Sequence, residues 1–398
     1  MAEILNIEDV RSKFPSLSQK QVYFDNAGGS QTLGAVIESI SEYLTNGQVQ
    51  MGATYDIGVR SSGRVQSGIE AGAKYINAET SEIVIGASTT QLLRNLAFAV
   101  DWRPGDELIL SKFDHETNID PWTFIAERFG LTVRWWTSAP SNAPRMDIED
   151  LKKLLSPKTR LVACTHASNI LGTINDIKVI AETVHTVEGA MLMVDGVSFA
   201  PHRTIDVKNL GVDFYSFSWY KVYGPHIAML YASTAAQKNL VSLGHYFNPT
   251  TTLDNKIGLA AASYELVQSI PAIVDYLKPV VPLIPAHEEK LQKILLDFLN
   301  SRSDVTVYGE RSSDPAVRVS TIAFSVDGWG TRELVERVEK LSDFGFRWGS
   351  FYSKRLADEI LQRPAEGVVR ASFVHYNSVE EVEEFVKVLE KVLSSRAS

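Results

Sequence analysis

Cysteine, long apolar runs and excess positive charge are scarce or missing in this sequence of 398 residues, and each absence removes a class of protein. The single cysteine, Cys164, excludes an intrachain disulfide and a metal site built from several cysteines, and we predict no metal site. Lys and Arg number 39 against 48 Asp and Glu, which gives a net charge of −9. This charge disfavours nucleic acid and anionic membranes as partners.

The sequence also lacks the usual signs of export or membrane insertion. Residues 1–17 have no basic stretch followed by an apolar run, which a secretory signal would show. No stretch reaches the roughly 18 uninterrupted apolar residues of a membrane helix. With 44% hydrophobic and 22% charged residues, the composition is that of a globular protein. We therefore expect a soluble, cytoplasmic protein with no membrane partner.

What the sequence does contain is a series of short apolar runs that alternate with helix-like segments. The expected strands are 82–86, 107–111, 131–136, 160–166, 191–196, 213–218 and 227–233. Strands that are apolar throughout and separated by helices indicate a mostly parallel sheet covered on both faces. We predict an α/β fold with a seven-stranded, mostly parallel sheet flanked by helices.

The order of elements changes near residue 285. A long helix-like stretch at 286–302 is followed by three strand-like runs and a closing amphipathic helix at 379–393, which indicates a separate α+β domain. A chain of this length is also too long for one compact core. We assign residues 1–20 to an N-terminal segment that joins the small domain, 21–284 to a large domain, and 285–398 to a small C-terminal domain.

Two charged residues stand where ligands bind in such sheets, just beyond the carboxyl ends of strands. Lys221 follows the strand 213–218 beside two aromatic residues, and desolvation there would free its amine to form a Schiff base. Asp195 ends an otherwise apolar strand and needs a cationic partner, such as a protonated pyridine nitrogen. A surface lysine and a capping aspartate are the alternatives. Their occurrence at the ends of successive strands favours a cofactor site.

A glycine and three hydroxyl residues, Ser88, Thr89 and Thr90, stand between a strand and a helix. Free N–H groups and hydroxyls at a helix start suit a phosphate, although such residues also cap helices with nothing bound. His115, just beyond the strand 107–111, could stack on a flat cofactor ring and transfer protons. A hydrogen-bonded structural histidine is the alternative.

Two further residues could orient ligands. Asn169 follows the strand 160–166 and could either bond a ring oxygen or make a turn. Arg370 is surrounded by apolar neighbours, where it could bind a carboxylate through two parallel hydrogen bonds or pair with an internal acid.

Six motifs in order, DNAGGS, DHETN, SNILGT, VDGVSFAPH, DFYSFSWYKVYGP and VRASFVHYN, resemble the class V aminotransferase family. These are pyridoxal 5'-phosphate (PLP) enzymes of fold type I, and their best-known members are cysteine desulfurases. The resemblance extends over residues 24–378. It implies PLP as cofactor, a small amino acid as substrate, and a homodimer with active sites at the subunit interface.

The resemblance also implies a role for each candidate residue. The catalytic residues would be Lys221, which holds the cofactor, Asp195, which pairs with the pyridinium, and His115, which stacks on the ring. The cofactor would further contact Asn169, Ser88, Thr89, Thr90, Ser198, Ser218 and Tyr220 and, from the neighbouring subunit, Thr250 and Thr251. The substrate would contact Arg370, Asn26, Ala27, Gly28 and Tyr352.

The departures from the family pattern concern the reaction. Desulfurases carry a cysteine in a loop of pattern RxGxxC, and the matching stretch 347–352 places Tyr352 there. A persulfide mechanism needs an accessible thiolate, and Cys164 stands in an expected core strand. Tyr220 replaces a histidine common before the lysine, and Ser198 replaces a glutamine common after the aspartate.

Within the family the chain resembles a fungal natural-product branch that includes a decarboxylative aldolase and a cyclase, of the ustiloxin and loline pathways. This likeness implies carbon–carbon bond formation of aldol or Mannich type, with an aldehyde or imine as second substrate. Three alternatives stay open at this point: a C–S or β-elimination lyase, an aminotransferase, and a non-catalytic PLP-binding scaffold.

Overall fold

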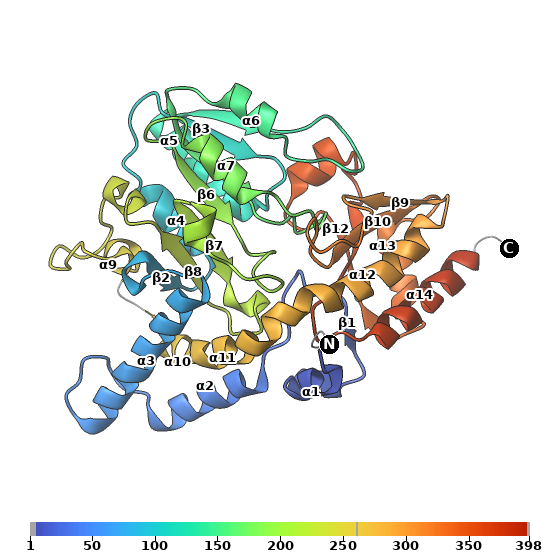
Figure 1. The fold of residues 1–398 in the computed structure, drawn as a ribbon, viewed down its shortest axis with the longest axis horizontal. Helices are drawn as coiled ribbons and strands as arrows, with labels where there is room; N and C mark the ends of the chain where they lie inside the picture. Colours follow the sequence, from blue (N-terminus) through green and yellow to red (C-terminus); the bar gives the residue numbers. More distant parts are fainter. Residues whose placement is uncertain (1–4, 260–261, 396–398) are drawn as a thin grey trace.

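The computed structural model describes residues 5–259 and 262–395. Its larger part is built on a seven-stranded sheet (Figure 1). The strands are β2 (Ile83–Gly86), β3 (Glu107–Ser111), β4 (Thr132–Trp136), β5 (Thr159–Thr165), β6 (Met191–Asp195), β7 (Phe214–Ser218) and β8 (Ala228–Ala232). Their order is β2-β8-β7-β6-β5-β3-β4, and within this sheet only β8 runs antiparallel to its neighbours. The predicted α/β class and the mostly parallel seven-stranded sheet are confirmed.

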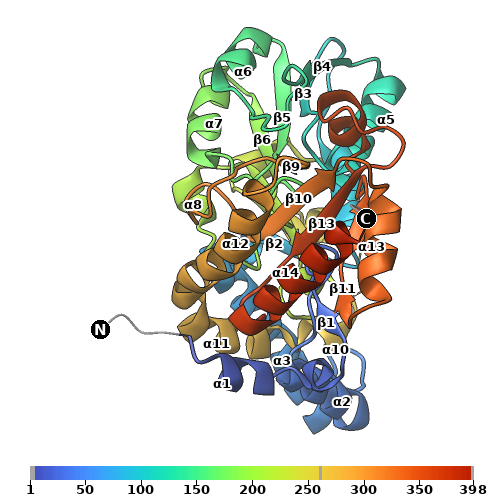
Figure 2. The ribbon, with the colours of Figure 1, turned by 90° about the vertical axis from the view of Figure 1, so that its right-hand side faces the viewer.

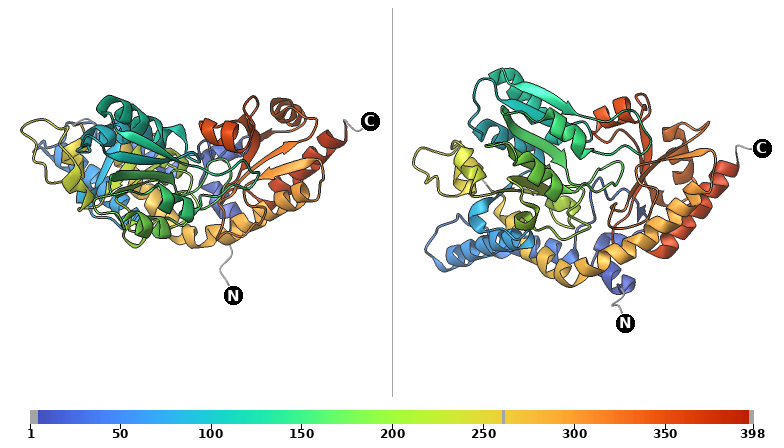
Figure 3. Two further views of the ribbon diagram at one scale, coloured as in Figure 1. Left: turned by 90° about the horizontal axis from the view of Figure 1, so that it is seen from above. Right: turned by 45° about the horizontal axis from the view of Figure 1, so that its top comes forward.

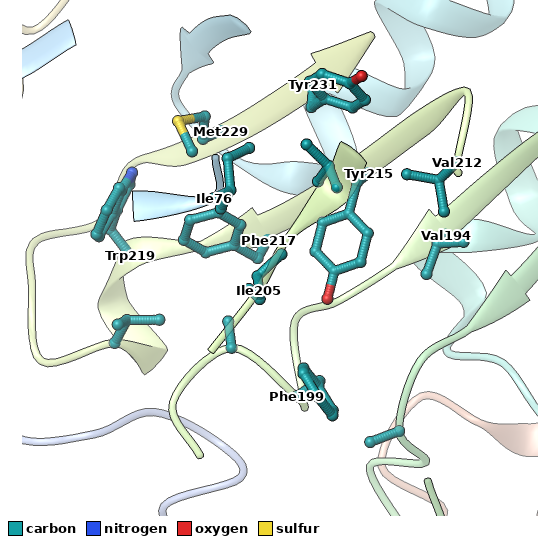
Figure 4. Packing of buried hydrophobic residues seen from close by; sticks show 14 of the residues in the cluster. Ile76, Val194, Phe199, Ile205, Val212, Tyr215, Phe217, Trp219, Met229 and Tyr231 are labelled. Carbon is teal, nitrogen blue, oxygen red and sulfur yellow. The ribbon is translucent and has the colours of Figure 1, made fainter. Parts of the chain in front are cut away.

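Helices cover both faces of this sheet because successive side chains of each strand point to opposite sides. Leu108 and Leu110 pack in a hydrophobic core on one face of the sheet, together with α4 (Thr89–Ala99) and α5 (Asp120–Phe129). Ile109 packs in a second hydrophobic core on the other face. In that second core Phe217 of β7 lies between Trp219 and Tyr215 (Figure 4). The helices of this part are α2 (Gly34–Asn46), α3 (Asp56–Tyr75), α4 (Thr89–Ala99), α5 (Asp120–Phe129), α6 (Ile148–Leu154), α7 (Ile177–Val184), α8 (Val207–Leu210) and α9 (Leu253–Ile257).

A second sheet forms the smaller part of the protein, at the right of Figure 1. Its antiparallel strands lie in the order β12-β13-β10-β9. Their bounds are β9 (Val305–Tyr308), β10 (Thr321–Val326), β12 (Arg347–Gly349) and β13 (Val368–Ser372). The helices α12 (Ile284–Asn300), α13 (Thr331–Glu339) and α14 (Val379–Ser394) bury their apolar faces in the core of this part. Figure 2 shows α12 and α14 next to each other on this sheet.

The N-terminal segment is tied to the smaller part. Strand β1 (Val22–Tyr23) pairs in parallel with β11 (Phe344–Gly345), and Arg11, in α1 (Ile7–Ser12), forms a 2.8 Å ion pair with Glu381 of α14. The residues that follow β1 are therefore brought between the two sheets, next to the carboxyl ends of the parallel strands.

A helical run connects the two parts along one side of the molecule (Figure 3). It comprises α10 (Tyr264–Val267), α11 (Ile270–Val280) and α12. By length and composition alone, Tyr264–Asn300 could cross a membrane. However, Ile273 and Leu277 are buried in the core of the larger part and Leu291 and Leu295 in that of the smaller part. The run therefore has the contacts of a core helix.

Candidate active site

The carboxyl ends of β5, β6 and β7 open onto one cavity. The residues that line it are Ser88, Thr89, Thr90, His115, Thr117, Thr165, Asn169, Asp195, Val197, Ser198, Ser218, Tyr220 and Lys221. The structure thus brings together most of the predicted cofactor contacts, which come from segments more than 130 positions apart in the sequence. Parallel strands cause this meeting because their carboxyl ends lie at the same edge of the sheet.

Lys221 ends a single helical turn, Trp219–Lys221, directly after β7. The turn is closed by a 2.8 Å hydrogen bond from the Val222 N–H to the carbonyl of Trp219, and the Trp219 N–H donates to the carbonyl of Ile227 at 2.8 Å, which fixes the backbone that carries the lysine. Burial lowers the pKa of Lys221 to about 8, and the charge of Arg370 acts in the same direction, while Asp195 and Asp25 oppose it. Lys221 is therefore a buried amine that loses its proton more readily than an ordinary lysine.

Asp195 is the last residue of β6 and is buried. Its Oδ1 accepts a 2.8 Å hydrogen bond from the backbone N–H of Val197, which orients the carboxylate. Burial raises the pKa of Asp195, whereas the Val197 hydrogen bond and the charge of Lys221 lower it. A second buried acid, Asp114, accepts hydrogen bonds from Asn118 and from the N–H of Thr165, and burial raises its pKa to about 8.

The hydroxyl residues gather at the start of α4. Ser88 caps the helix by accepting a hydrogen bond from the N–H of Gln91. The hydroxyls of Thr89 and Ser218 are 2.7 Å apart, and those of Thr90 and Thr117 are 3.0 Å apart. Hydroxyls beside the unpaired N–H groups of a helix start provide the donors that a phosphate needs.

His115 lies between β3 and α5, and its Nδ1 accepts a 3.1 Å hydrogen bond from the N–H of Thr117. Burial lowers the pKa of His115 to about 4, and the charges of Lys221 and Arg370 lower it further. The imidazole is therefore neutral at pH 7. Since Nδ1 accepts a hydrogen bond, Nε2 carries the proton of the neutral ring.

Asn169 lines the cavity and also holds the segment that follows β12. Its Nδ2 donates to the carbonyl of Phe351 at 2.9 Å, and its Oδ1 accepts from the Ser353 hydroxyl at 2.8 Å. The second hydrogen on Nδ2 is left for a ring oxygen. The backbone carbonyl of Asn169 accepts a 3.1 Å hydrogen bond from Nη1 of Arg370, which couples this residue to the predicted substrate contact.

Arg370, on β13, is buried and its Nη2 lies 2.7 Å from Oδ1 of Asp25. Its guanidinium also stacks over the ring of Phe351 at 3.7 Å. The Nε of Arg370 has no hydrogen-bond partner among the described residues. Because one N–H of this buried guanidinium is still unbonded, Arg370 can donate a hydrogen bond to the carboxylate of a ligand.

Other predicted contacts have different surroundings. The amide of Asn26 donates to the carbonyls of Tyr23 and Ser372 and accepts from the hydroxyl of Tyr376, so it belongs to a buried network. The N–H of Ala27 donates to the Ser372 hydroxyl. A Cβ added at Gly28 would lie 2.9 Å from the Asp25 carboxylate, so that position admits no side chain without movement. The three residues therefore form the backbone path beside Arg370.

Among the aromatic candidates, Tyr220 stacks on His226 with ring centroids 4.7 Å apart, and Tyr352 lies with its ring 5.3 Å from that of His115. Thr250 and Thr251 lie outside the cavity of their own chain. Their contact across a subunit interface stays a prediction.

Sequence reasoning did not single out Thr117, Thr165, Val197 or Asp114. Thr117 and Asp114 stand within two residues of His115, Val197 stands two residues after Asp195, and Thr165 is the last but one residue of the expected strand 160–166. Proximity to the end of a strand was therefore the signal that could have found them. Across residues 5–259 and 262–395, no group of three or more His, Cys, Asp or Glu side chains is arranged to hold a metal ion.

The donor set fits PLP. One cavity holds a buried amine for the aldehyde, a carboxylate for the ring nitrogen, a neutral imidazole for the ring face, and hydroxyls at a helix start for the phosphate. The fold and this site define a PLP-dependent enzyme.

Comparison with known proteins agrees with this class. The family described as "Aminotransferase class-V" matches residues 22–385. The chain is 55% identical to the aminotransferase-like protein FGM3 of Gibberella zeae, over 98% of each chain. It is 39% identical to the cysteine desulfurase-like protein ustD of Aspergillus flavus, over 99% of this chain and 92% of the other. The apo structure of a cysteine desulfurase from Thermococcus onnurineus matches with TM-score 0.89 and 25% identity, over 99% and 100% of the two chains. The chain belongs to the class V aminotransferase family, and its cofactor is PLP.

Replacing Cys164 by serine is expected to leave activity per PLP-loaded protein within about twofold of the unmodified chain. Cys164 is fully buried in β5, and burial raises the pKa of its thiol well above the ordinary value, so no thiolate is available. Steady-state kinetics at matched PLP content would test this. A folded, PLP-loaded Cys164→Ser protein without activity would contradict it, and Cys164→Ala controls for the cost of a buried hydroxyl.

The rate at which the apoprotein attaches PLP is expected to rise with pH, to reach half of its maximum near pH 8 and to level off about one pH unit higher. The neutral amine is the nucleophile, and the lowered pKa of Lys221, about 8, leaves about a tenth of it neutral at pH 7. Stopped-flow absorbance between pH 6 and 10 measures this rate. The reaction of PLP with Nα-acetyl-lysine, run in parallel, accounts for titration of PLP itself. A ratio of the two rates that is independent of pH would contradict the shifted pKa.

Proposed function

We propose that this enzyme generates a nucleophilic carbon from an amino acid and joins it to the carbon of an aldehyde or imine. The observation that carries the proposal is the loop 349–353, where the aromatic rings of Phe351 and Tyr352 lie against Arg370 and His115. A desulfurase would need a thiol there. The two rings instead offer apolar surface to a second carbon substrate beside Arg370 and His115.

When bound, PLP supplies the electron sink for this chemistry. Arg370 binds the α-carboxylate and so fixes which substituent of Cα is labile. His115 is neutral at pH 7 and would donate a hydrogen bond from Nε2, because the lone pair of its Nδ1 is used by the N–H of Thr117. Asp195 would pair with the ring nitrogen, and the Lys221 amine is the group in the same cavity that can accept a proton from carbon.

The resemblance to fungal natural-product enzymes supports a role in secondary metabolism, with a decarboxylation of the amino acid as one way to make the nucleophile. We further propose that the chain works as a homodimer in the cytoplasm. In the segment that carries Thr250 and Thr251, Tyr246 is 99% and Phe247 is 69% exposed. Two neighbouring aromatic rings in water would be covered if this segment reached a second subunit.

The test is a panel of amino acids that includes aspartate, incubated with the PLP-loaded protein with and without aldehydes. Mass spectrometry with ¹³C-labelled aldehyde detects a new carbon–carbon bond. A catalyst accelerates a reaction in both directions, so the same enzyme should also cleave the coupling product. In a second assay the protein is therefore incubated with γ-hydroxy amino acids and no aldehyde, and release of an aldehyde is measured.

The result expected is a product that contains both carbon skeletons, or the reverse cleavage, and neither with Lys221→Ala. Elimination products alone would indicate a lyase, and transfer of the amino group alone would indicate an aminotransferase. A PLP-loaded protein that converts no amino acid would indicate a binding scaffold. Each of these three results would overturn the proposal.

A further inference from the structure

Two consecutive aromatic residues beside the cavity adopt a backbone conformation that bulky side chains avoid. Phe351 has φ +49° and Tyr352 has φ +58°, both in the left-handed region. Such a conformation persists only where the surroundings enforce it, and it is concentrated at functional sites. The loop is therefore held in this shape by contacts that can be identified.

Those contacts come from both sides of the cavity. Asn169 binds the Phe351 carbonyl and the Ser353 hydroxyl, and the N–H of Glu116 donates to the Tyr352 carbonyl at 2.8 Å. Glu116 is itself held by an ion pair with Arg355. The strained pair is thus fixed to the segment that carries His115 and to the residue that follows β5.

As a result, neighbouring side chains of one loop face the two residues that would flank the substrate. The Phe351 ring lies 3.7 Å from the Arg370 guanidinium, and the Tyr352 ring lies 5.3 Å from the His115 imidazole at an interplanar angle of 32°. Tyr352 is 74% exposed and contacts the cavity through His115, which lines it. Phe351 therefore lies beside the predicted carboxylate ligand, Arg370, and Tyr352 lies between His115 and the solvent.

The hydroxyl of Tyr352 forms no hydrogen bond with any group in the described part of the chain. Among the hydroxyls that line the cavity, that of Thr89 pairs with Ser218, that of Thr90 pairs with Thr117, and that of Thr165 donates to the carbonyl of Ala167, whereas those of Ser198 and Tyr220 have no partner among the described residues. Tyr352 differs from these last two residues because its ring lies against that of His115. A buried or paired hydroxyl could not reach an entering carbonyl without first losing its partner.

We propose that Tyr352 is the general acid for the electrophile, an inference that rests on the proposed function. The nucleophilic carbon forms a bond to the carbonyl carbon, and the carbonyl π pair moves to its oxygen. The Tyr352 O–H bond breaks as its proton passes to that oxygen, and water returns a proton to the phenolate. No oxidant or reductant is needed, and in reverse the phenolate takes the hydroxyl proton as the carbon–carbon bond breaks.

The test compares Tyr352→Phe with the unmodified holoenzyme in two reactions. Coupling is measured with the amino acid and aldehyde of highest yield in the panel. Exchange of the α-hydrogen is measured by proton NMR in D₂O with the amino acid alone, and the affinity for that amino acid by titration of the cofactor absorbance. Tyr308→Phe is the matched control, because it removes a phenol oxygen that bonds Ser325 in the small sheet.

We expect Tyr352→Phe to lower kcat/KM for coupling by about 10²-fold, the usual contribution of a general acid, while exchange changes less than about threefold. Amino-acid affinity should also be unchanged, and Tyr308→Phe should behave like the unmodified protein. Coupling at the normal rate in Tyr352→Phe would overturn the assignment and leave the proposed function standing. An equal loss of exchange and coupling would also overturn it. If the unmodified protein forms no new bond, the proposed function fails and this inference with it.

Discussion

Replacing Lys221 by alanine should abolish covalent attachment of PLP and lower turnover by about 10⁴-fold or more, the scale of loss when a covalent group is removed. The side chain is buried at the end of β7, and burial and Arg370 lower its pKa to about 8. A buried ammonium is costly to the folded state, so the variant should fold at least as well as the unmodified protein. The loss is then one of chemistry.

Borohydride reduction followed by peptide mapping measures the attachment directly. The label should appear on Lys221 alone in the unmodified protein and be missing in Lys221→Ala, with folding followed by thermal melting. Lys178→Ala, which removes an exposed lysine of α7, should keep the label and the activity. A reduced label on any other lysine, or normal turnover without Lys221, would refute the assignment.

The strands and the residues at their ends could be predicted from the sequence because both depend on local patterns. Apolar runs of five to seven residues gave β3, β5, β6 and β7, and parallel strands necessarily bring their carboxyl ends to one edge. Asp195 and Lys221 could thus be placed together without coordinates. The resemblance to the family then added the roles of His115 and Arg370.

The contacts between distant segments could not be predicted in this way. The sequence placed Asn26 among the substrate contacts, yet its amide is used within a buried network with Ser372 and Tyr376. It placed Asn169 at the cofactor ring but gave no sign that the same amide also holds the loop of Phe351. Such bonds depend on how the two sheets face each other, and no local pattern carries that information.

Backbone strain was equally hidden. The positive φ angles of Phe351 and Tyr352 contradict the ordinary preference of aromatic residues, so a local reading favours an unstrained strand end there. Tertiary contacts from Asn169 and Glu116 override that preference. The general lesson is that local preference fails where function imposes geometry.

Replacing Asp195 by asparagine should lower turnover by about 10²-fold or more while leaving the free energy of unfolding nearly unchanged. The amide has the shape of the carboxylate, and its oxygen can still accept the hydrogen bond from the N–H of Val197. Burial raises the pKa of Asp195, which means that the charged carboxylate is costly in the folded protein. Stability should therefore not suffer when that charge is removed.

The catalytic loss has a separate cause. A carboxylate stabilises positive charge on the ring nitrogen, whereas an amide supplies only a neutral dipole, and fixed charges of this kind contribute about 10²-fold or more in a water-poor site. The pH dependence has a definite sign: the unmodified protein loses this stabilisation as pH falls and Asp195 takes up a proton. Burial raises the pKa of Asp195, and positive charge on the ring nitrogen would lower it. Asp195→Asn should lack this acid limb of the kcat profile.

A matched control lies at the opposite edge of the same sheet. Asp213 accepts a 2.8 Å hydrogen bond from the N–H of Leu192 and pairs with His185, whose pKa it raises. Asp213, like Asp195, accepts a backbone N–H, but it lies far from the cavity. Asp213→Asn should therefore reduce stability, because the ion pair with His185 is lost, and should leave kcat within about twofold. If Asp195→Asn and Asp213→Asn instead gave the same kcat and the same acid limb, Asp195 would have no part in the chemistry. The difference between the two variants is therefore the measure of what the site carboxylate contributes.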